Sequence, residues 1–327
     1  MQQALLMAIF LFASVSLAVG PLSGMGSVVE ERNANTNSGA AGGAPKRIFD
    51  FTLTPNMKTA DLDNPQSALS KLIAYIVKGA AKASAYVSIL HPSNAASQIQ
   101  LAIRDDSIFI PGGNPANAQH GFRRTDVNPA IDKATTLTGI TTWYQTIRLD
   151  SKAPLVLTHG YLFASIEVPS GKTTHFDPQN TDHKPTSNSQ TIRVRDFKSK
   201  TLLSLPLKYD QDYNFAVTVD WTQNTLTVYS SIGNQPLQKA GGPFPNDPKA
   251  MSPEFKQKGE YHIQLIKFPL ADAKVPVAKR LDTPHFGFQE PIKQEHVTFS
   301  NVYATAGKEI EQPKFSGSKS KKIKRSD

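Results

Sequence analysis

The chain has 327 residues, 39% of them hydrophobic, and a formal net charge of +9. This composition allows one large packed domain and excludes a chain that is disordered throughout. The absence of cysteine excludes a disulfide scaffold and a zinc site built on thiolates. The last 14 residues hold six Lys or Arg and one Asp, so most of the net charge belongs to the tail. The charge distribution therefore does not indicate a nucleic-acid partner.

The first residues have the pattern of an export signal. An apolar run over residues 4–19 ends at Gly20 and Pro21, and Ser16 and Ala18 are small residues at the positions that a signal peptidase reads. A transmembrane anchor is the alternative, but the run is short for one. We expect residues 1–18 to be a cleaved signal peptide and the protein to be secreted, to the extracellular space or the cell wall. No later segment is apolar enough to span a membrane.

Residues 19–46 are rich in Gly, Ser, Asn and Ala and contain too few apolar side chains to fold. We predict a disordered linker or pro-segment here. Lys46 and Arg47 at its end form either a processing site or the polar start of a strand.

From Arg47 onward, apolar and polar residues alternate as in β-strands. One helix is predicted over residues 65–76, and loops are predicted over 175–190 and 241–258. Without β-α alternation, this pattern predicts an all-β fold, a jelly roll or two-sheet sandwich with an open groove. A single domain is expected over residues 47–306, followed by a basic disordered tail over 307–327. The predicted strands cover residues 47–53, 85–90, 97–103, 139–149, 161–168, 191–195, 214–221, 225–231, 261–268 and 296–304.

The segment GFRRTDVNP places two arginines just before an aspartate within a strand-like run. Strict alternation puts Arg124 and Asp126 on one face of this strand. A guanidinium this close favours the ionised carboxylate and lowers its pKa, which suits a base or nucleophile. The alternative is a solvated salt bridge without chemistry.

The segment THGYLFASIEV carries the second candidate carboxylate. Alternation places His159, Tyr161, Phe163, Ser165 and Glu167 on one face, opposite a plainly apolar face. Sugars stack their C–H faces on aromatic rings, and carboxylates bind their hydroxyls, so this row is typical of a polysaccharide site. The alternative is a solvent-facing strand with scattered aromatic residues.

Two further polar groups are weaker candidates. In GEYHIQLIKF, His262 and Gln264 share the polar face, and His262 is either a substrate contact or a structural histidine. The loop with His175, Asp177 and Asp182-His183 has no recognised ligand spacing, so a polar loop is favoured over a metal site. We expect no metal and no cofactor.

Hydrolysis of a glycosidic bond usually requires two carboxyl groups on either side of the bond. Asp126 and Glu167 provide such a pair if their strands lie near each other. The motifs of serine hydrolases, P-loop NTPases and zinc proteases are absent from the sequence.

Six segments of the chain, in order, resemble glycoside hydrolase family 131, a family of fungal secreted β-glucanases. The resemblance covers most of the chain from Arg47 to Ala306. It implies a β-jelly roll with an open groove that acts on β-1,3-, β-1,6- and β-1,4-linked glucan without a metal. The segments are IAYIVKGAAKASAYVSILHPS, GFRRTDVNP, HGYLFASIE, DWTQNTLTVYSS, GEYHIQLIKFP and GFQEPIKQEHVTFSNVYA.

The resemblance also assigns roles to single residues. Glu167 matches one of the family's proposed catalytic carboxylates, and Asp126 occupies the position of the other, which is Glu in the family pattern. The chain also has Gly160 where the family usually has Glu. Four residues match further family positions and are expected to contact substrate: Arg123, Arg124, His159 and His262. Glu290 and Glu295 in the last segment are additional polar candidates.

Three functions fit these features. The first is an extracellular β-glucan hydrolase that uses a carboxylate pair. We expect this enzyme to be a monomer whose partner is the β-glucan polysaccharide. The second is a non-catalytic glucan-binding protein of the cell wall on the same fold, which would depend on Tyr161 and Phe163. The third is a polysaccharide lyase that neutralises a uronate with the arginine pair.

Overall fold

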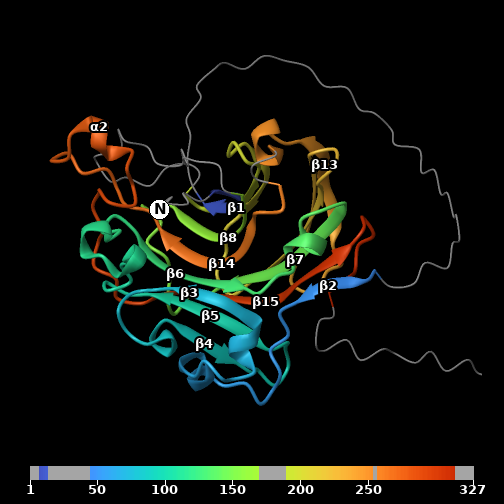
Figure 1. The fold of residues 1–327 in the computed structure, drawn as a ribbon, viewed down its shortest axis with the longest axis horizontal. Coiled ribbons are helices and arrows are strands. Elements are labelled where there is room, and N and C mark those ends of the chain that lie inside the picture. The colour runs from blue at the N-terminus through green and yellow to red at the C-terminus, as the bar shows by residue number, and fades with distance from the viewer. Residues whose placement is uncertain (1–6, 14–44, 169–188, 253–255, 314–327) are drawn as a thin grey trace, which may run out of the picture.

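The computed structural model describes residues 7–13, 45–168, 189–252 and 256–313. In this part of the chain, two antiparallel sheets pack face to face as a β-sandwich (Figure 1). The prediction of an all-β two-sheet fold is confirmed. No helix among the described residues has the length and hydrophobicity needed to cross a membrane.

The first sheet, sheet A, has seven strands in the order β10-β9-β1-β8-β14-β6-β3. It brings together strands that are far apart in the sequence, because β8, β14 and β6 are neighbours. In chain order its strands are β1 (Met7–Ala13), β3 (Ile73–Val77), β6 (Arg123–Pro129), β8 (Tyr161–Val168), β9 (Thr191–Arg195), β10 (Thr201–Pro206) and β14 (Glu260–Lys267).

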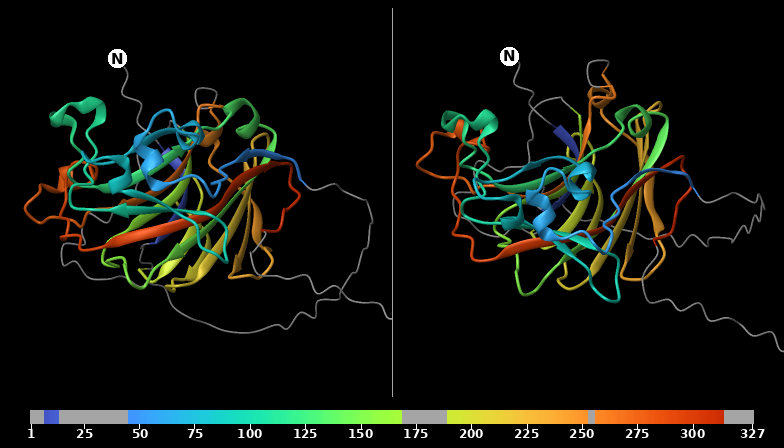
Figure 2. Two further views of the ribbon diagram at one scale, coloured as in Figure 1. Left: turned by 90° about the horizontal axis from the view of Figure 1, so that it is seen from below. Right: turned by 60° about the horizontal axis from the view of Figure 1, so that its bottom comes forward.

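The second sheet, sheet B, has eight strands in the order β13-β12-β11-β7-β15-β5-β4, and β2 (Arg47–Asp50) pairs with β15 beside this path. Its longest strand, β15, is drawn in red in Figure 2 and pairs with both β7 and β5. In chain order its strands are β4 (Val87–Leu90), β5 (Gln98–Ile103), β7 (Ile140–Leu149), β11 (Asp212–Asp220), β12 (Thr225–Ile232), β13 (Gln238–Pro245) and β15 (Glu295–Ala306).

The described helices are all short and lie in the connections between strands. They are η1 (Thr59–Asp63), η2 (Leu69–Leu72), η3 (Ala83–Ala85), η4 (Pro111–Gly113), η5 (Pro115–Asn117), α1 (Lys133–Thr136), η6 (Pro248–Met251) and α2 (Val277–Arg280).

The core lies between the two sheets and is built from the apolar face of each strand. Val127 of β6, Ile263 of β14 and Phe299 of β15 belong to one large buried cluster. Period-two alternation then requires the intervening residues of each strand to face away from the core. We call the face of sheet A that is turned away from sheet B the outer face of sheet A.

Three predictions of secondary structure were wrong. The predicted helix over 65–76 is the short η2 followed by strand β3, because β-branched and aromatic residues favour a strand from Ile73 onward. Strand β13 occupies the first part of the predicted loop 241–258, and β10 was missed. Strand β2 begins at Arg47, as the polar strand start predicts.

Part of the predicted signal segment pairs within sheet A. Strand β1 lies between β8 and β9 and pairs with both of them. This pairing does not test removal of residues 1–18, which stays a prediction. The predicted linker lies outside the described residues, apart from its last two.

The start of the predicted tail is part of the folded domain, which corrects its boundary. The carboxylate of Glu311 accepts hydrogen bonds from the Arg47 guanidinium at 2.7 and 3.1 Å. The Glu311 amide donates to the Tyr144 hydroxyl, and Gln312 bonds to both backbone groups of Leu237. The remaining residues, 314–327, lie outside the described part of the chain.

We expect truncation after Pro313 to leave the thermal midpoint unchanged, and truncation after Ala306 to lower it by several degrees. The longer deletion removes the Arg47–Glu311 ion pair and the segment that contacts the Tyr144 hydroxyl. Differential scanning calorimetry of the two truncated proteins checks this. Equal midpoints would show that these contacts add nothing to stability.

Candidate active site

Three adjacent strands place carboxylates and a histidine together on the outer face of sheet A. Gln264 of β14 is the register partner of Asp126 of β6, and Glu260 of β14 is the partner of Glu167 of β8. Paired residues of antiparallel strands point to the same side of a sheet, so all four side chains share the outer face. His262 lies between Glu260 and Gln264 on the same face of β14. We call Asp126, Glu167, Glu260 and His262 the carboxylate–histidine cluster.

The His262 ring connects the carboxylates of this cluster. Its Nε2 lies 2.9 Å from Oε2 of Glu167 and 3.9 Å from Oε2 of Glu260, and its Nδ1 lies 4.0 Å from Oδ2 of Asp126. One imidazole ring therefore spans the gap between Asp126 and Glu167. These contacts keep the nearer oxygens of the two carboxyl groups less than about 10 Å apart, which is the range that glycosidases use.

Asp126 is held by Arg124, a part-buried arginine. The Arg124 guanidinium forms an ion pair with the Asp126 carboxylate, whose side chain is 0% exposed. A second Arg124 nitrogen donates to the Gln119 side chain at 3.3 Å. Burial opposes the charge on Arg124, but the nearby carboxylates of Asp126 and Glu167 outweigh it and raise the pKa of Arg124. Arg124 therefore stays charged while it faces the Asp126 carboxylate.

Glu167 has the opposite environment. Its side chain is 10% exposed, and its Oε1 is buried with no hydrogen-bond partner among the described residues. Burial raises the pKa of the Glu167 carboxyl, against the opposing influence of His262 and Arg124. The two carboxyl groups therefore have different neighbours: Asp126 is paired with the Arg124 guanidinium, whereas Glu167 lies where burial raises its pKa.

Glu260 forms a third, more exposed arm of the cluster. The Tyr75 hydroxyl donates to Oε2 of Glu260, and Nζ of Lys133 lies 3.2 Å from its Oε1. Burial favours the neutral form of Glu260, but these two partners prevail and lower its pKa. Tyr75 and Lys133 are 40% and 39% exposed, so the cluster meets solvent on this side.

Two neutral side chains complete this face. Gln264 donates to the Ser165 hydroxyl at 2.7 Å. Asn128 is 1% exposed, and neither its amide nitrogen nor its amide oxygen has a partner among the described residues. Asn128 shares its face of β6 with Asp126, so it offers both a donor and an acceptor beside the cluster.

Tyr161 and Phe163 do not lie on this face, which corrects the prediction that they contact substrate. Both are 0% exposed and belong to the core cluster between the sheets. The register of β8 against β1 shifts between Leu162 and Ala164, so Phe163 is an extra residue in the ladder. This β-bulge reverses the alternation: Ser165 and Glu167 face outward, while Tyr161 and Phe163 face the core.

Tyr161 instead joins a polar group inside the core. Its hydroxyl donates to one oxygen of Glu295 at 2.6 Å, and Nζ of Lys267 donates to the other oxygen at 2.7 Å. Lys267 and Glu295 are both almost fully buried. The additional candidate Glu295 is therefore a structural group of the core.

Arg123 and His159 are also placed away from the cluster. Arg123 lies on the opposite face of β6 from Arg124 and donates to the backbone carbonyls of His120 and Phe122. The buried His159 ring contacts the carbonyl of Phe268 and the carboxylate of Glu290, and burial lowers its pKa to about 4. A role for either residue in binding substrate has no support from these contacts.

The sequence interpretation identified Asp126, Glu167, Arg124 and His262, and missed Glu260, Tyr75 and Lys133. Alternation along GEYHIQ could have found Glu260, because residues 260, 262 and 264 share one face. No local signal points to Tyr75 or Lys133, which reach Glu260 from segments that are far away in sequence. The histidine- and aspartate-containing loop considered for a metal lies outside the described residues. Elsewhere in the described chain, no cluster of three His, Asp or Glu is placed to hold a metal.

Comparisons with known proteins agree with this architecture. The family model described as "Glycoside hydrolase 131 catalytic N-terminal domain" matches residues 48–309. Strand β1 therefore lies outside the matched region. No curated protein matches the sequence.

Two solved structures are similar to this fold. A β-glucanase catalytic domain of the same family from Podospora anserina has a TM-score of 0.57 at 17% identity. It covers 82% of this chain and 98% of its own. A catalytic domain of the family from Coprinopsis cinerea has a TM-score of 0.55 at 15% identity, over 83% of this chain and 99% of its own.

Proposed function

Because this chain belongs to glycoside hydrolase family 131, we propose that it is a secreted β-glucan hydrolase that uses Asp126 and Glu167 as its carboxyl pair. The observation that carries the proposal is the arrangement of these two groups on either side of the His262 ring. Secretion rests on the sequence of residues 1–18. We also propose that the protein acts as a monomer and that the glucan it cleaves has β-1,3, β-1,6 or β-1,4 linkages.

The roles follow from the two environments. Glu167, whose burial favours the protonated form, donates a proton to the leaving glycosidic oxygen. Asp126, paired with the Arg124 guanidinium, acts either on a water molecule or on the sugar itself, and the carboxyl separation within the active complex decides between them. His262 contacts the donor and holds its carboxyl in place.

Neither competing function gains support from the site. A glucan-binding protein that depends on Tyr161 and Phe163 needs these rings at the surface, and both lie in the core. A lyase that neutralises a uronate with the Arg123–Arg124 pair needs both guanidinium groups on one face. Arg123 faces the other way, and Arg124 is paired with Asp126.

We expect the purified protein to release reducing ends from soluble β-1,3-, β-1,6- or β-1,4-glucan without forming an unsaturated product. Reducing-end release and ultraviolet absorbance, measured on the same reaction, separate a hydrolase from a lyase. Binding without either signal on all three linkages would instead favour the glucan-binding protein.

The rate of hydrolysis is expected to fall on the alkaline side as Glu167 loses its proton. Burial raises the pKa of Glu167 above its ordinary value of 4.5, so the protonated donor persists above that pH and is lost only as the pH passes the raised pKa. The pH dependence of kcat/KM checks this, because its alkaline limb reports the acid of the free enzyme. An alkaline limb at or below 4.5 would exclude Glu167 as the donor.

A further inference from the structure

Strand β9 carries two arginines on the outer face of sheet A. Ile192 and Val194 of this strand belong to the core cluster, so Arg193 and Arg195 point to the other side. Arg193 is 4% exposed and Arg195 is 5% exposed. Two guanidinium groups at alternate positions of one strand therefore concentrate positive charge at one largely buried part of this face.

Among the described residues, Arg193 has no counterion to balance its charge. Its Nε and Nη2 are buried and have no hydrogen-bond partner in the part of the chain that the structure describes. Burial and the charge of Arg195 lower the pKa of Arg193 to about 10, so it remains charged at neutral pH. A buried charge without a partner is strongly unfavourable, and such a group is a candidate for binding a ligand of opposite charge.

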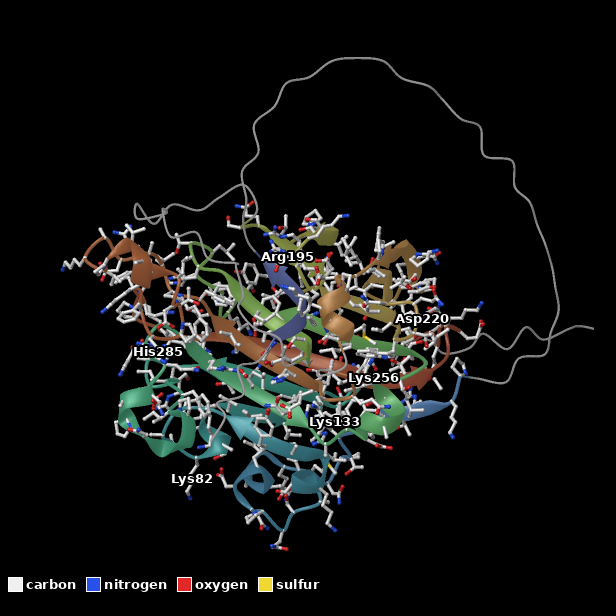
Figure 3. The ribbon with its side chains drawn as sticks, turned by 45° about the horizontal axis from the view of Figure 1, so that its top comes forward. Lys82, Lys133, Arg195, Asp220, Lys256 and His285 are labelled. Atoms are coloured by element: carbon white, nitrogen blue, oxygen red, sulfur yellow. The ribbon has the colours of Figure 1, made fainter. Side chains whose placement is uncertain are left out.

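The strand order relates these arginines to the carboxylate–histidine cluster. In the chain that retains residues 7–13, Phe10 of β1 is the register partner of both Arg195 and Ser165, and Ser165 is in turn the partner of His262. Removal of the proposed signal segment takes β1 out of this row, so the binding test below uses the full chain. Arg195 and His262 thus lie in one row across the sheet, three strand spacings or roughly 14 Å apart at the backbone. In Figure 3, Arg195 and Lys133 are labelled on either side of the strands of sheet A. A polysaccharide that crosses the strands from the cluster towards β9 would reach the arginines a few sugar units away.

We propose that Arg193, with Arg195 beside it, forms a subsite for the carboxylate of a uronic acid residue. A guanidinium presents parallel N–H donors that match the two oxygens of a carboxylate, and the bond is strongest where water is excluded. Arg193 offers two buried donors of this kind, at Nε and Nη2. That the carboxylate belongs to a glucan polymer rests on the proposed function. Binding of a carboxylate by Arg193 does not depend on that function.

The test compares a soluble β-glucan partly oxidised at C6 to glucuronate with the same glucan before oxidation. We expect the protein to bind the oxidised glucan more tightly, and Arg193→Gln to reduce that affinity by about tenfold or more while leaving the neutral glucan unaffected. Arg148→Gln is the matched control, because it removes one positive charge from a part-exposed pair with Asp212 on sheet B. A parent protein that binds both glucans equally, or equal losses in the two variants, would overturn the proposal.

Two further measurements address separate questions. The thermal midpoint shows whether Arg193 is needed for folding, and competition by single sugars shows whether the carboxylate is the group that is recognised. Arg193 has no described hydrogen bond to lose, so the thermal midpoint of Arg193→Gln should not fall, whereas a structural role would lower it. Competition by free glucuronate, with glucose as the control, shows whether the carboxylate alone is recognised. Competition by glucuronate supports a carboxylate subsite, and equal competition by glucose contradicts it.

The inference and the proposed function fail in different ways. Hydrolysis of neutral glucan without any preference for the oxidised form would overturn the subsite and leave the hydrolase intact. Arg193-dependent binding of oxidised glucan by a protein that hydrolyses nothing would support the subsite and contradict the hydrolase.

Discussion

Replacing Glu167 with glutamine is expected to reduce β-glucan hydrolysis by about a thousandfold or more while glucan binding is retained. Glutamine has nearly the shape of the protonated acid, but its amide cannot deliver a proton to the glycosidic oxygen, and general acid catalysis contributes about 10²–10⁴ in rate. The closest contact of the carboxyl is Nε2 of His262 at 2.9 Å, and an amide can still occupy that position. Initial rates and binding isotherms on the same glucan measure the two effects separately.

Glu290→Gln is the matched control for this variant. The Glu290 carboxyl contacts a histidine ring, as the Glu167 carboxyl does, but its partner is His159 and its side chain is 39% exposed. We expect Glu290→Gln to hydrolyse glucan at the rate of the parent. If both variants lose the same amount of hydrolytic activity, the cause is the change in charge, and Glu167 is not the proton donor.

The stability of Glu167→Gln should also depend less on pH. Because burial raises the pKa of Glu167 in the folded state, the folded protein holds this proton more tightly than the unfolded chain. The free energy of unfolding of the parent therefore has a contribution that is fully present at low pH and is lost above the ordinary value of 4.5. Glutamine does not titrate, so the variant lacks this contribution to the pH dependence.

Much of the sandwich could be predicted because alternation within a strand is local information. Strands β8 and β9 were predicted at their observed bounds, and β7, β11, β12, β14 and β15 were found to within a few residues. The segment around η2 and β3 was misread as a helix because its apolar residues also fit a spacing of four. Strand β3 forms where β6 offers a partner, and that pairing is not visible in the sequence.

The candidate site shows where local patterns stop being sufficient. Arg124, Asp126, Glu167 and His262 each followed from alternation or from the family resemblance. Tyr161 and Phe163 were placed wrongly because one extra residue in β8 reverses the alternation. A bulge of this kind is set by pairing with a neighbouring strand, so it cannot be read from β8 alone.

The position of Asp126 leads to the second prediction with a large effect. We expect Asp126→Glu to raise the rate of β-glucan hydrolysis, because the family pattern has the longer side chain at this position. In the structure, Oδ2 of Asp126 lies 4.0 Å from Nδ1 of His262, which is beyond hydrogen-bond distance. One additional methylene extends the carboxylate towards the His262 ring. Since a misplacement of about 1 Å can reduce a rate by about 100-fold, the gain can approach that size.

The opposite change is expected from Asp126→Asn, which should abolish hydrolysis because an amide is neither a base nor a nucleophile. This variant also leaves Arg124 buried without its carboxylate, which destabilises a protein by about 3–5 kcal/mol. Its activity must therefore be measured well below its own thermal midpoint. Asp220→Glu, the same lengthening at the end of β11, is the control for the additional methylene and should leave the rate unchanged.

In Asp126→Glu, the longer glutamate side chain has to fit into a space that is packed around the aspartate side chain. Asp126 is 0% exposed, and inserting a methylene into a packed position costs about 1–3 kcal/mol unless its neighbours move. Arg124 is 15% exposed and has a long side chain, so it can shift while keeping its ion pair. The thermal midpoint and kcat/KM of Asp126→Glu should therefore move in opposite directions, with slightly lower stability and faster hydrolysis. A variant that keeps the stability of the parent and gains no activity would show that reach does not limit catalysis at Asp126.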